Sequence, residues 1–226
     1  QQGETDFLQL LAWPQALVEH NGKTTGFAMS VLDPTKFVGL DSFFDYNLRH
    51  NLPNADFKSL SLLCNLIIKF ADVLAFLHEK NIHVVDLKPQ NIKVSIKDLS
   101  VHLLDCDGFS IWKDELRHPA ELISTDYIAP EATRQKLSPK TLGESQDRYA
   151  FAVLIFQLLN KGIHPFQGII AKNWLGLSTN DEKAEAGLYA YGAAPDPQIK
   201  PHPRSVHTHF PRTLISLFAQ AFTGSS

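Results

Sequence analysis

The sequence predicts an α+β fold, because it carries signals for short antiparallel strands and for long helices in the same chain. An Asn-Gly pair at residues 21–22 lies between two short apolar runs, which is typical of a tight hairpin turn. Apolar residues then recur at helical spacing from residue 60 to about residue 78. A third segment, residues 149–159, is apolar on nearly every face. A small sheet and a set of packed helices are therefore expected.

The N-terminal half is expected to hold two hairpins and one long helix. The first hairpin pairs the apolar runs at residues 8–18 and 25–32. The amphipathic helix follows, and its apolar stripe needs a core to pack on. Residues 92–96 and 101–104 then predict a second hairpin, which ends at an Asp-rich turn. The loop before it, residues 86–91, contains a proline and several polar side chains.

In the C-terminal half, residues 149–159 predict a helix buried on all sides, at the centre of the domain. Residues 179–187 are polar and favour a further helix. Residues 193–203 are rich in proline and are expected to form a loop. Residues 211–222 regain helical periodicity, so a last helix is expected there.

Composition excludes several classes of function. The 226 residues are 44% hydrophobic and 20% charged, which favours one compact domain. The net charge of -3 is scattered along the chain, so neither nucleic acid nor an anionic membrane is an expected partner. The first residues have no basic or apolar leader, and residues 149–159, the longest apolar run, are too short to span a bilayer.

The only cysteines, Cys64 and Cys106, each lie in an apolar stretch. Packed thiols in a reducing compartment fit this usage better than disulfides, so a cytoplasmic location is expected. Cys106 could also be considered as a nucleophile. However, Asp105 and Asp107 flank it and would raise the pKa of its thiol, so packing is the favoured role.

The strongest motif is Asp86-Leu87-Lys88-Pro89-Gln90-Asn91, which resembles the catalytic loop of protein kinases. At residue frequencies of roughly 5% each, its five family residues arise by chance about once in a few million starting positions. Phosphoryl transfer requires a carboxylate to orient the attacking hydroxyl, a cation near the transferred group and oxygen ligands for Mg²⁺. The resemblance implies that Asp86, Lys88 and Asn91 supply one of each.

Further motifs follow in the order typical of the family. Asp105-Cys106-Asp107 stands where kinases carry Asp-Phe-Gly, so the resemblance implies that Asp105 binds Mg²⁺. Ala129-Pro130-Glu131 reproduces the end of a kinase activation segment. Ser124 has the spacing of the family's substrate-facing Thr, and Asp147 that of the Asp that holds the catalytic-loop backbone.

The chain therefore resembles a eukaryotic-type Ser/Thr protein kinase domain, and the resemblance implies ATP and Mg²⁺ as cofactors and a protein as substrate. Residues 1–32 would be a remnant of the N-lobe, with two strands and the hinge, and residues 33–226 the helical C-lobe. Lys88, two residues after Asp86, is the Ser/Thr-type signature. A second, narrower resemblance is to a bacterial kinase branch found beside von Willebrand A-type and PP2C-type phosphatase partners, including tellurite-resistance gene sets. Within that branch Met29 would be the gatekeeper, although it could equally fill the core, and Ser30 and Leu32 would meet adenine through their backbone.

The sequence also departs from the family pattern. It contains no Gly-rich loop, strand lysine or partner glutamate, and the pattern continues past both ends of the chain. Lys93 stands where the family has an apolar residue under adenine. We favour an orientation in which its ammonium extends to water, and the alternatives are an ion pair or a contact with a phosphate. Val85 replaces the Arg that reads a phosphorylated activation segment. Glu131 lacks the Arg with which it would pair.

Two alternative functions remain open at this point. One is a pseudokinase or scaffold that binds partners, because a fold alone never proves activity. The other is a small-molecule kinase of the aminoglycoside type, which usually lacks the segment ending at Glu131. A second copy of the chain or a partner would cover apolar strand faces left open by a missing N-lobe. The cluster of His202, His207 and His209 lies in a polar, proline-rich loop and is interpreted as solvated rather than metal-binding.

Overall fold

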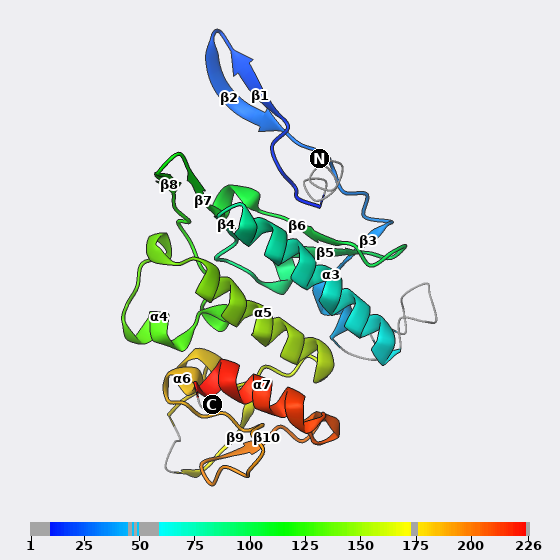
Figure 1. Ribbon diagram of the computed structural model, residues 1–226, viewed down its shortest axis with the longest axis vertical. Coiled ribbons are helices and arrows are strands. Elements are labelled where there is room, and N and C mark those ends of the chain that lie inside the picture. Colours follow the sequence, from blue (N-terminus) through cyan, green and yellow to red (C-terminus); the bar gives the residue numbers. More distant parts are fainter. Residues whose placement is uncertain (1–9, 45–46, 48, 50–58, 173–175, 225–226) are drawn as a thin grey trace.

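The computed structural model describes residues 10–44, 47, 49, 59–172 and 176–224 (Figure 1). Its strands are β1 (Ala16–His20), β2 (Lys23–Ala28), β3 (Phe37–Gly39), β4 (Ile82–His83), β5 (Ile92–Ser95), β6 (Val101–Leu103), β7 (Ser110–Lys113), β8 (Leu116–His118), β9 (Gly168–Ile170) and β10 (Ile199–Pro201). Its helices are α3 (Leu60–Glu79), α4 (Pro130–Arg134), α5 (Glu144–Leu159), α6 (Asn180–Glu185) and α7 (Arg212–Thr223). The predicted α+β class is confirmed.

The first hairpin is confirmed, although its strands are shorter than the apolar runs. β1 pairs antiparallel with β2 around Asn21 and Gly22, both of which have positive φ. The part of the first run before residue 10 lies outside the described residues. The hairpin projects away from the rest of the structure (Figure 1). Its apolar side chains are consequently exposed, with Leu17 at 69% and Phe27 at 48% of their surface.

The second hairpin is confirmed as β5 and β6, and it forms the centre of a three-stranded sheet in the order β3-β5-β6. β3 was not predicted, because only three residues take part in it. The chain just before Trp13 also joins this sheet, since the N–H of Ala12 donates to the carbonyl of Leu103 at 2.8 Å. The polar loop residues lie next to the ends of these strands, so the sheet fixes their positions.

Helix α3 agrees with the predicted amphipathic helix, and Ser59 caps its N-terminus by accepting the N–H of Leu62. By length and composition α3 could cross a membrane, although Asn65, Lys69 and Asp72 interrupt its apolar sequence. Its periodic apolar face is instead buried in the core of the domain. The buried residues are Leu63, Leu66, Phe70, Val73, Leu74 and Leu77.

Helix α5 is the central element, as its nearly uniform apolar pattern predicted. Ala150, Leu154 and Leu158 belong to the cluster that contains α3 and the β3-β5-β6 sheet. Val153 and Phe156 belong to a second cluster, shared with α7 and the aromatic residues near residue 190. Because α5 contributes to both clusters, it joins the two halves of the hydrophobic core.

The C-terminal part follows the prediction with one correction. Thr179 begins α6 with a reciprocal capping box with Glu182, and α7 follows the expected periodic segment. The proline-rich residues 193–203, expected to be a loop, include the short strand β10, which pairs with β9. Proline occupies the last position of β10, where a missing N–H is tolerated at the edge of a two-stranded sheet.

The prediction for the two cysteines was half wrong. Cys106 is buried, but Cys64 is exposed on α3. Cys64 follows Leu63 directly, so it lies about 100° around the helix from the buried face, and an apolar stretch does not bury every residue in it.

The buried His164 makes stability depend on pH. Its Nε2–H donates to the carbonyl of Asp126 at 2.9 Å, and its Nδ1 accepts the N–H of Phe166 at 3.3 Å. Burial lowers the pKa of His164 from 6.5 to about 4. The unfolded chain therefore binds a proton more readily than the folded one between these two values, and stability falls as pH decreases through this window.

We expect the free energy of unfolding to fall by about 1.4 kcal/mol per pH unit through this histidine, from pH 6.5 towards the folded pKa. Urea unfolding at several pH values would measure the slope in wild type and in His164→Gln, whose amide can replace Nε2–H. The variant should show a shallower slope. Equal slopes in both proteins would show that His164 does not carry the effect.

Candidate active site

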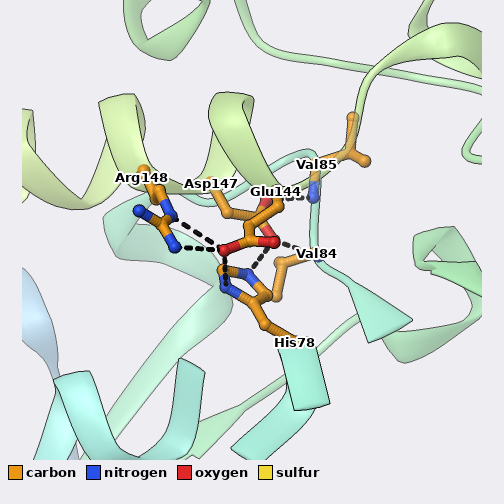
Figure 2. A network of polar contacts seen from close by, with 6 residues as sticks. All are labelled: His78, Val84, Val85, Glu144, Asp147 and Arg148. Atoms are coloured by element: carbon orange, nitrogen blue, oxygen red, sulfur yellow. Dashed lines mark hydrogen bonds and ion pairs between the residues drawn. The ribbon is translucent and has the colours of Figure 1, made fainter. Parts of the chain in front are cut away.

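The backbone of the polar loop is held by Asp147, near the start of α5 (Figure 2). Its Oδ2 accepts the N–H of Val84 at 2.8 Å, and its Oδ1 accepts the N–H of Val85 at 2.7 Å. The Nε2–H of His78 donates to Oδ2 at 2.9 Å. Asp147 is fully buried, and its neighbour Glu144 pairs with Arg148 on the outside of the helix. One carboxylate thus joins α5, α3 and the loop.

This anchoring keeps the loop in a conformation that the backbone would not favour alone. Val85 has a φ of 62°, which is rare for a β-branched residue. Its side chain is fully buried. Such a conformation persists only where the surroundings determine it. Here the N–H groups of Val84 and Val85 both donate to Asp147. The strained turn directly precedes Asp86.

Asp86, Lys88 and Ser124 form a closed set of contacts. Lys88 Nζ donates to Asp86 Oδ2 at 2.5 Å and to Ser124 Oγ at 2.9 Å. The N–H of Ser124 donates to Asp86 Oδ1 at 2.7 Å. The ammonium of Lys88 therefore contacts both the carboxylate of Asp86 and the hydroxyl of Ser124, and the backbone of Ser124 closes the set, although Ser124 lies 38 residues beyond Asp86 in the chain.

These residues line a cleft of about 480 Å³, together with Asn91, Asp105 and Asp107. Asn91 Nδ2 donates to the carbonyl of Asp86 at 3.3 Å, which leaves its Oδ1 as an acceptor for another group. Asp105 lies two residues after the end of β6, has a φ of 60° and is exposed. Carboxylate and amide oxygens are the ligands that Mg²⁺ prefers, so the donor set fits this ion.

The described residues contain no cluster of three His, Cys, Asp or Glu side chains suited to a metal on their own. Protein kinases share their magnesium ions between side chains and nucleotide phosphates, and an Asn and an Asp supply the protein ligands. The pair Asn91 and Asp105 corresponds to that arrangement. When bound, Mg²⁺ would neutralise charge that develops on the phosphates.

Cys106 is placed for packing rather than for chemistry. It belongs to the same buried cluster as Val84, and its Sγ contacts the carbonyl of Leu103 at 3.6 Å. Burial raises the pKa of the thiol to about 12, and Asp107 and Asp105 add to this shift. A thiol with this pKa stays protonated at neutral pH, which agrees with the packing role expected from the sequence.

The segment from β7 to Ala129 is hydrogen-bonded to the rest of the site at two points. β7 pairs with β4 and with β8. Arg117, on β8, donates through Nη2 to the carbonyl of Leu142, just before α5, and through Nε to Ser110 Oγ at 3.1 Å. Gln146, also on α5, accepts the N–H of Ala129 and donates to the carbonyl of Tyr127. Arg117 and Ala129 are thereby bonded to α5 or to the residues just before it.

Residues 41–203 match the family model described as "Protein kinase domain". The chain belongs to the protein kinase family. It is 28% identical to "Protein kinase YegI" of Escherichia coli (strain K12) over 232 residues, which covers 98% of this chain and 34% of the relative. It is 30% identical to "Aurora kinase" of Candida glabrata over 53% of this chain. It is 38% identical to "cAMP-dependent protein kinase type 3" of Saccharomyces cerevisiae over 41% of this chain. The chain spans about a third of the length of the curated relatives it matches.

The family membership confirms the predicted kinase-like α+β fold. The kinase domain brings together in one cleft the predicted residues Asp86, Lys88, Asn91, Asp105 and Ser124. It does not bring the predicted nucleotide-binding residues Met29, Ser30, Leu32 and Lys93 to the described lining of this cleft. The first three follow β2, and Ser30 Oγ accepts Gln15 Nε2 at 2.9 Å, whereas Lys93 lies on β5 between Gly39 and His102. Glu131 is exposed in the first turn of α4.

Sequence reasoning missed three polar residues of the site. His78 donates to Asp147 but lies 69 residues before it in the chain. The only signal in the sequence was its position at the end of a predicted helix. Gln146 fixes the Ala-Pro-Glu segment, and its position next to Asp147 was the available signal. Asp107 lines the cleft beside Asp105, although only its effect on the pKa of Cys106 was considered.

Proposed function

We propose that this kinase domain transfers the γ-phosphoryl group of ATP to Ser or Thr of a protein. The observation that carries the proposal is the closed set of contacts among Asp86, Lys88 and Ser124 beside the two oxygen ligands of the cleft. The set supplies a group to orient an acceptor hydroxyl and a cation for the transferred phosphoryl group. Phosphoryl transfer requires chiefly this positioning and electrostatic stabilisation.

Each residue has a specific part in this proposal. Asp86 orients the acceptor hydroxyl, and Lys88 stabilises the charge of the transition state. Asn91 and Asp105 hold Mg²⁺. Ser124 already accepts a hydrogen bond from Lys88, so its hydroxyl lies where an acceptor side chain would have to approach. Ser124 is therefore the residue we assign to the substrate-facing position.

The wider setting is also a proposal. The free thiols of Cys64 and Cys106 are compatible with a reducing cytoplasm, where we place the protein. The narrower sequence resemblance favours von Willebrand A-type and PP2C-type phosphatase partners. The exposed apolar side chains of the β1–β2 hairpin would be covered by further strands of the N-lobe, a partner or a second copy. A pseudokinase would share this surface but would not transfer phosphate.

The test is transfer of labelled phosphate from Mg-ATP by the full-length product of the gene to serine, threonine and tyrosine peptide libraries. Label should reach serine and threonine, and Asp86→Asn should lower the rate about 100-fold or more, because the amide cannot accept the hydroxyl proton. Ser124→Ala is the matched control in the same cleft, with an expected loss below tenfold. Mg-ATP binding without transfer in wild type would favour the pseudokinase.

Phosphoryl transfer should not require a phosphate on the activation segment. Val85 occupies the position of the Arg that would receive one, and Arg117 within the segment already bonds the carbonyl of Leu142. Phosphatase treatment should therefore leave the transfer rate within about twofold. Arg117→Gln should lower the rate about tenfold, because the segment loses its hydrogen bond to the carbonyl of Leu142, just before α5. A rate that collapses after phosphatase treatment and recovers on re-phosphorylation would contradict this expectation.

A further inference from the structure

One carboxylate of the catalytic cleft has no part in the proposed phosphoryl transfer. Asp107 lines the cleft together with Asp105 and Asn91, and its side chain is exposed. In protein kinases the corresponding position of the Asp-Phe-Gly motif is a glycine, which has no side chain. The cleft of this chain therefore contains a carboxylate that the family pattern does not supply.

The local backbone turns Asp107 towards the cleft. Cys106–Gly108 form a single turn of 3-10 helix, in which the N–H of Gly108 donates to the carbonyl of Asp105 at 3.0 Å. Successive residues of such a turn point about 120° apart. Cys106 and Phe109 are both buried and anchor the turn in the core. Asp105 and Asp107 lie on either side of Cys106, and both are exposed to the cleft.

The carboxylates of Asp105 and Asp107 are not compensated by a cation of the protein. The other two carboxylates of the described lining, those of Asp86 and Glu121, each pair with a lysine ammonium, at 2.5 and 2.9 Å. In the part of the chain that the structure describes, neither Asp105 nor Asp107 has an ion pair or a side-chain hydrogen bond. Two like charges this close in the chain repel each other, and a divalent cation would remove the repulsion.

An amide oxygen completes the set of donors. Asn91 Nδ2 donates to the carbonyl of Asp86 at 3.3 Å, so Asn91 Oδ1 is the end of the amide that can bind an ion. The cleft thus offers one amide oxygen and two carboxylates. Mg²⁺ is usually bound through one or two carboxylates and keeps several waters, so these three groups suffice for a hydrated ion.

We propose that Asp107 is a third protein ligand of the metal site, and that this site consequently holds a divalent cation before the nucleotide binds. The inference rests on the proposed function, because Asn91 and Asp105 are taken as the first two ligands. In the usual kinase arrangement two side chains share the ion with nucleotide phosphates. Here a second carboxylate replaces part of the contribution of the phosphates. The bound ion also offsets two negative charges that would otherwise repel the triphosphate.

The experiment measures binding of Mn²⁺ to the full-length product by the electron paramagnetic resonance signal of the free ion, first without nucleotide and then with a non-hydrolysable ATP analogue. Asp107→Gly restores the family residue, and Asp107→Asn removes the charge while keeping the size of the side chain. Asp114→Gly is the matched control, because Asp114 is exposed in the turn between β7 and β8 and is not part of the described cleft lining. Asp105→Asn tests the metal site of the proposed function itself.

Without nucleotide, wild type and Asp114→Gly should bind Mn²⁺ saturably, and both Asp107 variants should bind it at least tenfold more weakly. The ATP analogue should restore most of the lost affinity, because its phosphates supply oxygen ligands. Equal nucleotide-free affinity in wild type and the Asp107 variants, or no saturable nucleotide-free binding in wild type, overturns the inference.

The Asp105→Asn variant separates this failure from a failure of the proposed function. If it loses the Mn²⁺ that wild type binds with the ATP analogue, the assigned metal site stands whatever the Asp107 variants show. If it binds Mn²⁺ as wild type does under both conditions, the metal site of the proposed function is wrong, and the role of Asp107 in it is wrong as well.

Discussion

Replacing Asp147 with alanine is expected to lower the free energy of unfolding by about 3 kcal/mol or more and to abolish phosphoryl transfer. The substitution leaves the N–H groups of Val84 and Val85, and the Nε2–H of His78, without their acceptor in a buried site. Each unsatisfied buried donor costs about 1–3 kcal/mol. Since folded domains are stable by only about 5–15 kcal/mol, a large part of the total would be lost.

The effect on activity follows from the same contacts (Figure 2). Without Asp147, Val85 would relax from its positive φ, and Asp86, the next residue, would move with it. A displacement of about 1 Å at a catalytic group can reduce the rate about 100-fold, and a larger reorganisation reduces it further. We therefore expect a loss of at least about 1000-fold in the rate of the full-length product.

Two variants make this prediction specific. Asp147→Asn keeps one carboxamide oxygen as an acceptor but presents N–H₂ towards a donor, so it should be less stable than wild type and more stable than the alanine variant. Glu144→Ala removes a partly exposed carboxylate from the same turn of α5, and should change stability by less than about 1 kcal/mol. Urea unfolding and hydrogen exchange at Val84 and Val85 would measure these differences. An Asp147→Ala protein as stable as Glu144→Ala would contradict the assigned role.

Local patterns predicted the elements that local sequence determines. The apolar period of α3, the uniform apolarity of α5 and the Asn-Gly turn each depend on a few neighbouring residues, and all three agree with the structure. The loop at Asp86 was found for another reason. Its residue types and spacing are set by chemistry, so they can be identified without knowing where the loop lies in the fold.

Elements that depend on distant partners were not predicted. β7 and β8 turn at Asp114 and Glu115, which both have positive φ but offer no glycine as a signal. β3 is three residues long and exists because β5 pairs with it. The exposure of Cys64 depends on its angle around α3 rather than on the polarity of its neighbours. In each case the deciding information is tertiary.

The 226 residues alone are expected to transfer phosphate at least about 1000-fold more slowly than a longer chain in which a Gly-rich loop and a strand lysine precede them. In the proposed function, Asp86, Lys88, Asn91 and Asp105, which line the described cleft, position an acceptor hydroxyl and a metal ion. In protein kinases the triphosphate is also held by a Gly-rich loop and by a strand lysine. The 226 residues contain no such loop. Losing about 4 kcal/mol of transition-state stabilisation corresponds to roughly a thousandfold in rate.

The two chains would be compared in a labelled-ATP transfer assay, each with its own Asp86→Asn variant as the blank. The exposed β1–β2 hairpin gives an independent readout, because further N-lobe strands would protect its amides from hydrogen exchange in the longer chain. If the short chain were as fast above its blank as the long one, the additional phosphate contacts would be unnecessary. Lys93 would then be the first residue to test as a phosphate-binding lysine, since it lies on β5, the strand that directly follows Asn91. Lys93→Met should then abolish the activity of the short chain, because methionine keeps the apolar stem but not the charge.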